Sequence, residues 1–522
     1  MDLIKEPWLP VIRVDGTKTK IPLIELLDNA VLDTAYLRAD FQNASWQMLA
    51  GLLQCTVAPE DDDDWEEIWN DGIDPNDWQD GLQAVSSAFQ FGAEKPSFLQ
   101  SYDALGSEYG SIAGLLIDAP GENALKHNKD HFIKRRSVER ICPDCAVMAL
   151  FTVQTNSPAG GAGYRVGMRG GGPLTTLVMP MAGQHVPLWK KLWLNVITQT
   201  KEPTSEKLTQ IFPWLGPTRT SEKAGNVITP ENAHPLQAYW GMPRRIEIDF
   251  AHTDAGNCDL CGEHHQALLL QMRSKNYGVQ YDGWLHPFSP YRQALKDPSS
   301  PWLALKGQPG GLCYKDWLGI LLEGEDKFNR TLPAKVVRAA TERANILACG
   351  LWCSAYDMDN AKARCWYQHR IPLIDTSRAD LLQAVMQQVV SLASDSLSLL
   401  RNALRSAWFA NPKEATVDFG TVNTAFWQET EPAFLSLLVI LAGDPQRKNA
   451  ASCQALRQWE MQLHTYLLEV FDRNALTDVD CPSDILSRRL VARRILDGAY
   501  CKQKTRKDVL LLGEEQKEKQ HA

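Results

Sequence analysis

Two pairs of cysteines, each with a two-residue spacer, constrain the fold more than any other feature of this sequence. Cys142-Pro-Asp-Cys145 and Cys258-Asp-Leu-Cys261 are separated by 112 residues. Thiolates at this spacing can bind one tetrahedral zinc ion, and a glycine such as Gly262 favours a tight turn after the second pair. We therefore expect Cys142, Cys145, Cys258 and Cys261 to hold one structural zinc ion. That ion would join two distant segments and leave no coordination position open for water.

Two other interpretations of the cysteine pairs remain open. The four thiols can be free, or each pair can be a redox pair of the thioredoxin type. Neither pair is expected to open a helix after a clear strand, which argues against the redox interpretation. The other eight of the twelve cysteines are scattered among apolar or mixed residues, where buried free thiols are expected.

The sequence also carries no export or membrane signal that we recognise. Residues 1–5 lack the basic and apolar regions of a signal peptide. The longest nearly continuous apolar run, Ala433–Ala442, is too short to cross a bilayer. We therefore expect a cytoplasmic protein without a membrane partner.

The hydrophobic patterns predict an α+β fold with two domains. A chain of 522 residues is longer than one hydrophobic core usually serves. Residues 1–375 are expected to form a large mixed domain that contains the zinc site. Its strand patterns include Ile21–Leu23, Thr175–Met179 and Arg245–Ile248, and its interrupted helical patterns include Ala44–Leu53 and Val336–Ala348.

Residues 376–522 are expected to form a helical domain. Thr376 and Ser377 are suitable N-caps for a run in which apolar residues recur every three or four positions. Further helical patterns cover Val422–Leu441, Ala451–Phe471 and Ser483–Tyr500. Four helices with short connections favour an antiparallel four-helix bundle.

The charge distribution leaves a nucleic-acid partner open. The net charge is −9, whereas surfaces that bind phosphate are usually basic. Residues 60–67 alone contribute seven acidic side chains, and without them the net charge would be −2. The segment Lys126–Arg140 holds six basic residues and two acidic ones. A solvated surface loop is the alternative interpretation of this basic segment.

Common catalytic motifs are missing from the sequence. We find no GxxxxGK[ST] phosphate-binding loop, no HExxH, no GxSxG and no set of kinase motifs. We therefore expect a protein that is not an enzyme. The alternatives are a zinc-stabilised hydrolase or transferase with a site of another kind, and an assembly scaffold without DNA contact.

A glycine-rich segment, Asn156–Pro173, follows the first cysteine pair closely. Seven of its residues are glycine, and Arg165 and Arg169 add positive charge. Glycine allows a backbone to approach a partner closely and to take a positive φ. A flexible loop or a set of turns is the alternative interpretation.

These motifs together resemble the CasA family, the large subunit of the type I-E CRISPR surveillance complex Cascade. The resemblance rests, in chain order, on CPDCAVMALF, SPAGGAGYRVGMRGGGPLTTLV, CDLCG, HPFSP and YDMDNAKARCWYQHRIPL. The N-terminal DLIKEPWLPVIRVDG and the later FWQETEPAF also fit the family pattern, so the resemblance runs over nearly the whole chain.

The resemblance implies a function in antiviral defence. It implies a mixed N-terminal domain, a four-helix bundle, and binding of double-stranded target DNA through the protospacer-adjacent motif. It also implies help in opening the duplex for a guide RNA, which needs no ATPase because the new heteroduplex balances the melted DNA. The implied partners are the other Cascade subunits, the guide RNA and the helicase–nuclease of the system.

The resemblance also assigns a DNA-contacting loop. The glycine loop of the family falls on Ala159, Gly160, Gly161, Ala162 and Gly163. Well-known members have glycine at the first and fourth of these positions. Because alanine does not adopt a positive φ easily, Ala159 and Ala162 imply an altered DNA contact or an altered range of accepted motifs.

Single residues of the family's site match as well. Its minor-groove lysine matches Lys275, fifteen residues before Pro290 of HPFSP. The minor groove offers a degenerate pattern, so one lysine there should tolerate several motifs. An ordinary surface lysine is the alternative. Phe132 matches an aromatic residue in a loop near the motif and the neighbouring subunit, and a buried core aromatic is its alternative.

The hairpin with which the family separates the DNA strands, here called the wedge hairpin, corresponds to the Asp359–Lys362 region. The glutamine that the family inserts beside the motif is absent. We expect Asn360 or Lys362 to replace it, since a stiff tip that competes with base stacking is sufficient.

Overall fold

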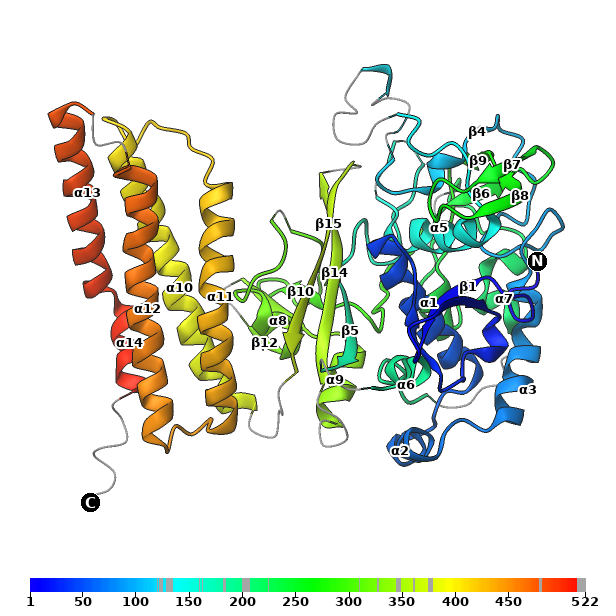
Figure 1. Cartoon of the computed structure of the whole chain (residues 1–522), viewed down its shortest axis with the longest axis horizontal. Coiled ribbons are helices and arrows are strands. Elements are labelled where there is room, and N and C mark those ends of the chain that lie inside the picture. The colour runs from blue at the N-terminus through cyan, green and yellow to red at the C-terminus, as the bar shows by residue number, and fades with distance from the viewer. Residues whose placement is uncertain are drawn as a thin grey trace. The chain divides into compact units, whose positions relative to one another are not determined.

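Short strands and short helices alternate through the first two thirds of the chain, and long helices follow (Figure 1). The computed structural model describes residues 1–119, 121, 125–127, 135–158, 160–161, 163–181, 185–199, 207–223, 225–308, 310–325, 328–343, 349–359, 362–373, 379–477 and 481–513. The chain divides into two compact units. The first comprises residues 1–311 and 325–373, and the second comprises residues 312–324 and 374–522.

Helices and strands mix throughout the first unit. Its helices are α1 (Ala39–Thr56), α2 (Asp62–Asp71), α3 (Pro75–Val85), α5 (Pro143–Asn156), α6 (Leu188–Trp193), α7 (Leu208–Ile211) and α9 (Lys335–Glu342). Its strands up to the second cysteine pair are β1 (Leu9–Arg13), β2 (Lys18–Ile21), β3 (Val31–Thr34), β4 (Gly110–Ser111), β5 (Thr175–Pro180), β6 (Arg245–Ile248) and β7 (Thr253–Asn257). Later strands are β8 (His264–Leu269), β9 (Gln271–Lys275), β10 (Tyr291–Ala294), β11 (Leu303–Ala304), β12 (Gly324–Glu325, at the junction of the units), β13 (Asn329–Leu332), β14 (Cys349–Asp359) and β15 (Lys362–Pro372).

The strands form several small sheets. The strand orders are β2-β1-β3, β4-β9-β6, β15-β14-β5, β11-β10-β13-β12 and the pair β7-β8. Every pairing of β9 and of β14 is antiparallel. Two of these sheets matter most for the site, because β9 ends at Lys275 and β14 and β15 form the long hairpin in Figure 1.

The acidic run of residues 60–67 lies at the N-terminus of helix α2. Asp61 is the N-cap of α2, and its side chain accepts a hydrogen bond from the backbone N–H of Asp64. The first turn of α2 contains Asp62, Asp63 and Asp64. Carboxylates are favoured there because the N-terminus of a helix carries a partial positive charge. The run therefore stabilises a helix start.

The core of the first unit is rich in aromatic side chains. Phe89, Phe98, Phe212, Trp214 and Trp240 are all buried and pack in edge-on or tilted contacts. Helix α1 is buried along almost its whole length, which suits a helix that is covered on every side. The sheets and loops of the site are thus built around a dense interior.

Arg169 of the glycine-rich segment lies in this interior and does not add to a charged loop. Its guanidinium donates hydrogen bonds to Thr175 Oγ1 (3.0 Å), Ser289 Oγ (3.0 Å) and Gln47 Oε1 (2.6 Å). Burial lowers the pKa of Arg169 to about 10. Ser289 belongs to the HPFSP motif, so this arginine joins the glycine-rich segment, that motif, α1 and β5.

The second unit consists mainly of long helices. They are α10 (Ala379–Trp408), α11 (Gly420–Gly443), α12 (Ala450–Ala475), α13 (Ser483–Lys502) and the shorter α14 (Lys504–Leu512), with α8 (Trp317–Leu321) from the 312–324 segment. Helix α10 packs against α11, α12, α13 and α14, and α11 packs against α12 (Figure 1). Tyr314 stacks on Phe434 at 4.3 Å and donates or accepts a hydrogen bond with Thr430, so residues 312–324 belong with these helices.

Most sequence-predicted elements are confirmed, with shifted ends. The strands predicted at Thr175–Met179 and Arg245–Ile248 are β5 and β6, and the predicted helical patterns lie within α1 and α10–α13. The strand expected at Ile21–Leu23 is wrong beyond Ile21, because Pro22 precedes a 3₁₀ turn at Leu23–Glu25. Val336–Ala348 corresponds to α9 up to Glu342. Residues 344–348 and the predicted caps Thr376 and Ser377 lie outside the described residues.

No helix in the described part of the chain combines the length and the apolar character that a membrane crossing requires.

Replacing Arg169 by methionine should destabilise the first unit. The change leaves the polar atoms of Gln47, Thr175 and Ser289 without their buried donor. We expect Arg169→Met to lower the apparent free energy of unfolding by ~3 kcal/mol, measured by chemical denaturation. The control is Arg292→Met on β10, where the arginine is exposed and a change within about 0.5 kcal/mol is expected. Equal effects in the two variants would contradict this role.

Candidate functional site

The four cysteines of the two CxxC pairs lie together. Their Sγ atoms are all within 4.8 Å of one another, and the Sγ atoms of Cys142 and Cys261 are 3.8 Å apart. Zn–S bonds of about 2.3 Å in a tetrahedron place sulfur atoms about 3.8 Å apart. The sequence prediction that these residues share one place is therefore confirmed, and the cluster could hold a metal ion.

Backbone amides donate hydrogen bonds to the sulfur atoms of Cys142 and Cys258. The N–H groups of Cys142 and Leu260 donate to Cys258 Sγ at 3.3 and 3.4 Å, and the N–H of Cys145 donates to Cys142 Sγ at 3.4 Å. Hydrogen bonds from the Cys142 and Cys145 thiols lower the pKa of Cys258. Amides directed at sulfur favour the thiolate form, which is the form that binds metals.

The first cysteine pair opens a helix, but no strand directly precedes it in the described residues 135–141. Cys142 is the N-cap of α5 and Pro143 is its first residue, so this pair does open a helix. Ile141 before it forms an isolated antiparallel bridge with Leu269. The expected absence of a clear strand before the helix is therefore confirmed, and the meeting of all four sulfur atoms in one cluster is a second argument against a redox pair.

Side chains around the cluster join three parts of the first unit. Lys20 of β2 forms ion pairs with Asp144 (2.6 Å) and with Glu263. The carboxylate of Asp259 accepts hydrogen bonds from the N–H groups of Glu139 (2.7 Å) and Arg140 (2.9 Å). The cluster thus fixes the end of the basic segment Lys126–Arg140 against the second cysteine pair.

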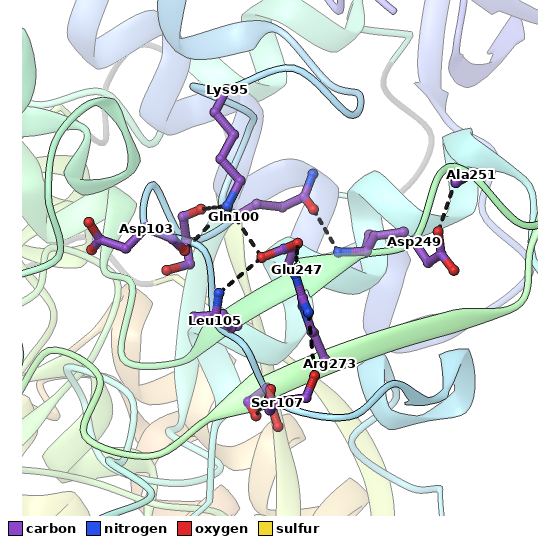
Figure 2. A network of polar contacts seen from close by, with 12 residues as sticks. Lys95, Gln100, Asp103, Leu105, Ser107, Glu247, Asp249, Ala251 and Arg273 are labelled. Carbon is purple, nitrogen blue, oxygen red and sulfur yellow. Dashed lines mark hydrogen bonds and ion pairs between the residues drawn. The ribbon is translucent and has the colours of Figure 1, made fainter.

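From the second pair the chain runs through β8 into β9, which a partly buried charge network holds in place. Figure 2 shows Glu247 of β6 at the centre of this network, between Lys95 and Arg273. Arg273 donates to one carboxylate oxygen of Glu247, and the N–H of Leu105 and the ammonium of Lys95 donate to the other at 3.3 and 3.4 Å. Arg273 also lies over the ring of Tyr109 at 4.6 Å.

The network fixes the charge of Glu247. Burial by itself would raise the pKa of this carboxyl, but the hydrogen bond from Arg273 and the charge of Lys95 hold it below its ordinary value. Glu247 and Arg273 are directly opposite in the β6–β9 register. Because β9 is paired with β4 and β6 and fixed by this ion pair, its last residue projects from a rigid strand.

That last residue is Lys275. Its side chain is exposed, and within the described residues it forms no hydrogen bond and no ion pair. A concave site of about 570 Å³ lies beside it, lined by Glu222, Ser274, Lys275, Asn276 and Tyr277. Glu222 pairs with Arg245 at 3.4 Å. The ammonium of Lys275 is therefore available to an outside partner.

The glycine-rich segment lies directly against the residues after Lys275. The N–H of Tyr277 donates to the carbonyl of Gly163 at 2.7 Å, and Tyr277 itself has a φ of +62°. A Cβ on Gly163 would lie 3.0 Å from Asn276 Cβ and 3.0 Å from the Tyr277 ring, and Gly163 has a φ of +79°. Close approach and backbone conformation both require glycine here.

The other end of the segment lies against the long hairpin. A Cβ on Gly172 would lie 2.7 Å from Met358 Cγ and 2.9 Å from the Tyr356 carbonyl oxygen. The N–H of Gly307 donates to the carbonyl of Gly172 at 3.1 Å. One glycine-rich segment therefore contacts both the end of β9 and strand β14.

The hairpin carries Lys362 at its far end. Asp359 and Lys362 are the last pair in the β14–β15 register, and a bulge lies between Asp357 and Met358. Asp357 accepts two hydrogen bonds from Arg364, at 3.1 and 2.7 Å, which stiffens the two strands just below the tip. Lys362 is exposed.

The structure places Gly163 against Asn276 and Tyr277, the two residues that follow Lys275. Gly160 forms a bridge with Tyr164 of the same segment. Lys362 lies on the hairpin that meets the same segment at Gly172. Contact of any of these residues with DNA stays a prediction. Phe132, Ala159, Ala162 and Asn360 lie outside the described residues.

Sequence reasoning missed two residues that support the glycine loop. Arg244 lies over the ring of Tyr164 at 4.8 Å and donates to Ser157 Oγ (3.2 Å) and to the Pro158 carbonyl. Tyr164 forms a hydrogen bond with Ser274 at 3.2 Å, beside Lys275. Tyr164 could have been identified as a site residue because it lies inside the glycine-rich motif. The sequence around Arg244 contains no motif that would identify it.

Substituting Gly163 should disturb the contact with Tyr277 more than substituting Gly161. Both glycines have a positive φ, but the nearest atom to a Cβ on Gly161 is Tyr164 Cδ2 at 3.9 Å. Gly161→Ala should cost about 1 kcal/mol of stability from the backbone alone. Gly163→Ala should cost ~3 kcal/mol because it also crowds the tyrosine.

Hydrogen exchange of the Tyr277 amide provides the second measurement. We expect faster exchange in Gly163→Ala and unchanged exchange in Gly161→Ala, since only the first substitution strains the Tyr277–Gly163 hydrogen bond. If both variants exchange alike, the close approach at Gly163 does not constrain this loop.

Solved structures share this fold over nearly the full chain. CasA (Cse1) of Thermus thermophilus superposes with a TM-score of 0.69 at 16% sequence identity, covering 96% of this chain and 99% of that one. Cse1 of Thermobifida fusca gives a TM-score of 0.68 at 16% identity, covering 98% of each chain. A chain described as part of a "CRISPR RNA-guided surveillance complex" gives 0.67 at 14% identity, covering 96% and 99%.

The sequence itself matches a family model over most of its length. The model describes CRISPR-associated protein Cse1, and the match spans residues 2–470. It includes both cysteine pairs, the glycine-rich segment, Lys275 and the long hairpin, and it agrees with the resemblance inferred from the motifs. The chain therefore belongs to the CRISPR-associated protein Cse1 family.

Proposed function

We propose that this chain is the subunit of a CRISPR surveillance complex that recognises the protospacer-adjacent motif in double-stranded target DNA. One observation carries the proposal: the glycine-rich segment lies against the end of β9, where Lys275 projects without a protein partner. One of the solved structures with a similar fold is described as part of such a complex, which supports the proposal that this chain belongs to one.

Lys275 would contact the motif through the minor groove. An ammonium group that projects from a fixed strand can reach acceptors on base edges, and its charge is attracted to the negative potential of the groove. The backbone of Gly160, Gly161 and Gly163 would lie close to the DNA, because glycine removes the side chains that would keep the duplex away. The rigid β4-β9-β6 sheet supports such a role, since a mobile lysine would discriminate less.

The hairpin of β14 and β15 would begin strand separation. Its ion pair between Asp357 and Arg364 stiffens the two strands, and Asn360 or Lys362 would insert beside the motif. Side chains inserted between base steps unstack them at a cost of a few kcal/mol, which binding elsewhere on the duplex must offset. The contact of Gly172 with this hairpin supports a coupling between motif recognition and opening.

A structural zinc ion at the four cysteines completes the proposal for the first domain, residues 1–375. Zinc bound there would add to the folding free energy and would take no part in a reaction, since protein atoms fill all four positions. Phe132 and the basic segment would engage DNA or a neighbouring subunit. We propose no catalytic activity for this chain.

The second domain, residues 376–522, would be an antiparallel four-helix bundle. The packing of α10 with α11, α12 and α13 supports this architecture. The partners in the proposal are the guide RNA, the other subunits of the complex and the helicase–nuclease of the system.

Lys275→Ala should weaken capture of DNA that carries the motif. We expect an approximately tenfold loss of affinity, about 1–2 kcal/mol, when the complete complex is assayed by gel shift on duplexes that differ only at the motif. Assembly of the complex should be intact. Lys296→Ala is the matched control, because it removes an exposed lysine outside the site. Unchanged capture by Lys275→Ala would remove this residue from the site, and capture without regard to the motif would overturn the proposed function.

Cys258→Ser should remove the metal and destabilise the first domain together. We expect about one zinc ion per wild-type chain by elemental analysis, and a loss of zinc with a lower unfolding midpoint in the variant. Cys365→Ser is the control, since Cys365 is exposed on β15 and belongs to none of the residue groups in the described part of the chain that could hold a metal. Wild-type protein that folds fully without zinc in the presence of a strong chelator would refute the zinc assignment.

A further inference from the structure

A cavity in the second unit has no part in the site described above. It measures about 450 Å³ and lies between the C-terminal half of α10 and the start of α11. We call it the α10–α11 pocket. Its lining includes Ser398, Arg401, Asn402, Arg405, Phe419 and Asn423.

Two guanidinium groups line this pocket without a carboxylate partner. Arg401 donates to Ser398 Oγ at 3.1 Å, and Arg405 lies over the ring of Phe419 at 5.5 Å. Neither arginine forms an ion pair with any residue in the described part of the chain. Arginines that are half-buried in a protein usually have an anionic partner, so this pair presents uncompensated positive charge to the pocket.

Two polar atoms at the pocket also lack hydrogen-bond partners. Nε of Arg405 and Oδ1 of Asn423 are both shielded from solvent and unpaired within the described residues. Buried polar atoms are costly unless they are hydrogen-bonded. A half-turn of the Asn423 amide exchanges its oxygen and nitrogen, so this side chain can present an N–H donor at the same place. The pocket then offers donors from three side chains.

The start of α11 adds to the positive character. The helix has 24 residues and begins at Gly420. Its N-cap residue Phe419 and Asn423 of its first turn line the pocket. Its N-terminus carries a partial positive charge. Asp418 accepts a hydrogen bond from the N–H of Gly420 at 2.8 Å and so compensates part of this charge, but Asp418 does not line the pocket.

We propose that the α10–α11 pocket binds a phosphate group of a nucleic-acid strand. Arginine matches phosphate with paired N–H donors, and the stacking of Arg405 on Phe419 holds its guanidinium ready for this contact. The volume is within the range of roughly 300–1,000 Å³ that holds drug-sized ligands, so a phosphate can enter with its sugar attached. Asn402 is exposed, which leaves an opening for a polymer. This proposal does not depend on recognition of the motif by Lys275.

Strand binding by the full-length chain tests the proposal. The probe is a short fluorescent single-stranded oligonucleotide without the motif, followed by anisotropy. We expect Arg405→Gln to weaken binding about tenfold and to make the slope of log affinity against log salt shallower by about 0.7, the value for one lost phosphate contact on a single strand. Arg405→Lys keeps the positive charge but loses the paired N–H donors of the guanidinium, so its affinity should lie between those of wild type and Arg405→Gln.

Arg494→Gln is the matched control, because it removes one exposed arginine from α13 away from the pocket. Equal weakening by Arg494→Gln and Arg405→Gln would show a general charge effect and overturn the proposal. So would equal affinities in wild type and Arg405→Gln. Unchanged unfolding midpoints of the variants establish that they fold.

A titration with inorganic phosphate tests whether the pocket binds free phosphate or the phosphate of a nucleic-acid strand. If phosphate raises the unfolding midpoint of wild type but not of Arg405→Gln, while both bind the strand equally, the pocket takes free phosphate and the assignment to a strand is wrong. The ratio of affinities for duplexes with and without the motif should be the same in Arg405→Gln and in wild type, so failure here and failure of motif recognition remain distinguishable.

Discussion

The close approach of the backbone at Gly163 and Gly172 is the constraint on which the arrangement of the site depends. At one end the segment meets the turn after Lys275, and at the other it meets the β14–β15 hairpin. A side chain at either glycine would separate surfaces that are in contact. Because Arg169, between the two glycines, is fixed by three buried hydrogen bonds, the segment between the contacts is held from inside. A glycine-rich sequence is usually taken to mean flexibility, but here the glycines permit tight packing.

Electrostatics divides the positive charges of the first unit into two groups. Arg273, Arg169 and Lys20 are bound to protein partners and position strands and loops. Lys275 and Lys362 are exposed on rigid strand ends. Desolvated ion pairs such as Glu247 with Arg273 are weak evidence for stability, but they do fix geometry. The negative net charge of the chain is thus compatible with a local cationic surface.

Local patterns made part of this structure predictable. β5 and β6 follow from β-branched runs, the helices of the second unit from apolar periodicity, and the meeting of the four cysteines from ligand spacing. A hairpin in the Asp359–Lys362 region followed from the family resemblance. Tertiary contacts decided the rest. Three features depend on contacts between residues that are more than fifty positions apart in the sequence. They are the burial of Arg169, the left-handed backbone of Tyr277 and the hydrogen bonds of Arg244. The same holds for residues 312–324, whose place with the long helices depends on Phe434 and Thr430.

The hairpin has a further consequence for how the protein avoids associating with itself. In the order β15-β14-β5, the eleven-residue β15 is an edge strand, with a row of backbone groups that another strand could pair with. Natural proteins protect such edges with charged side chains, because self-pairing would bring like charges opposite one another. β15 carries Lys362, Arg364 and Arg370 along its length. The same cations that discourage a second copy from adding to the sheet have the sign that attracts a polyanion.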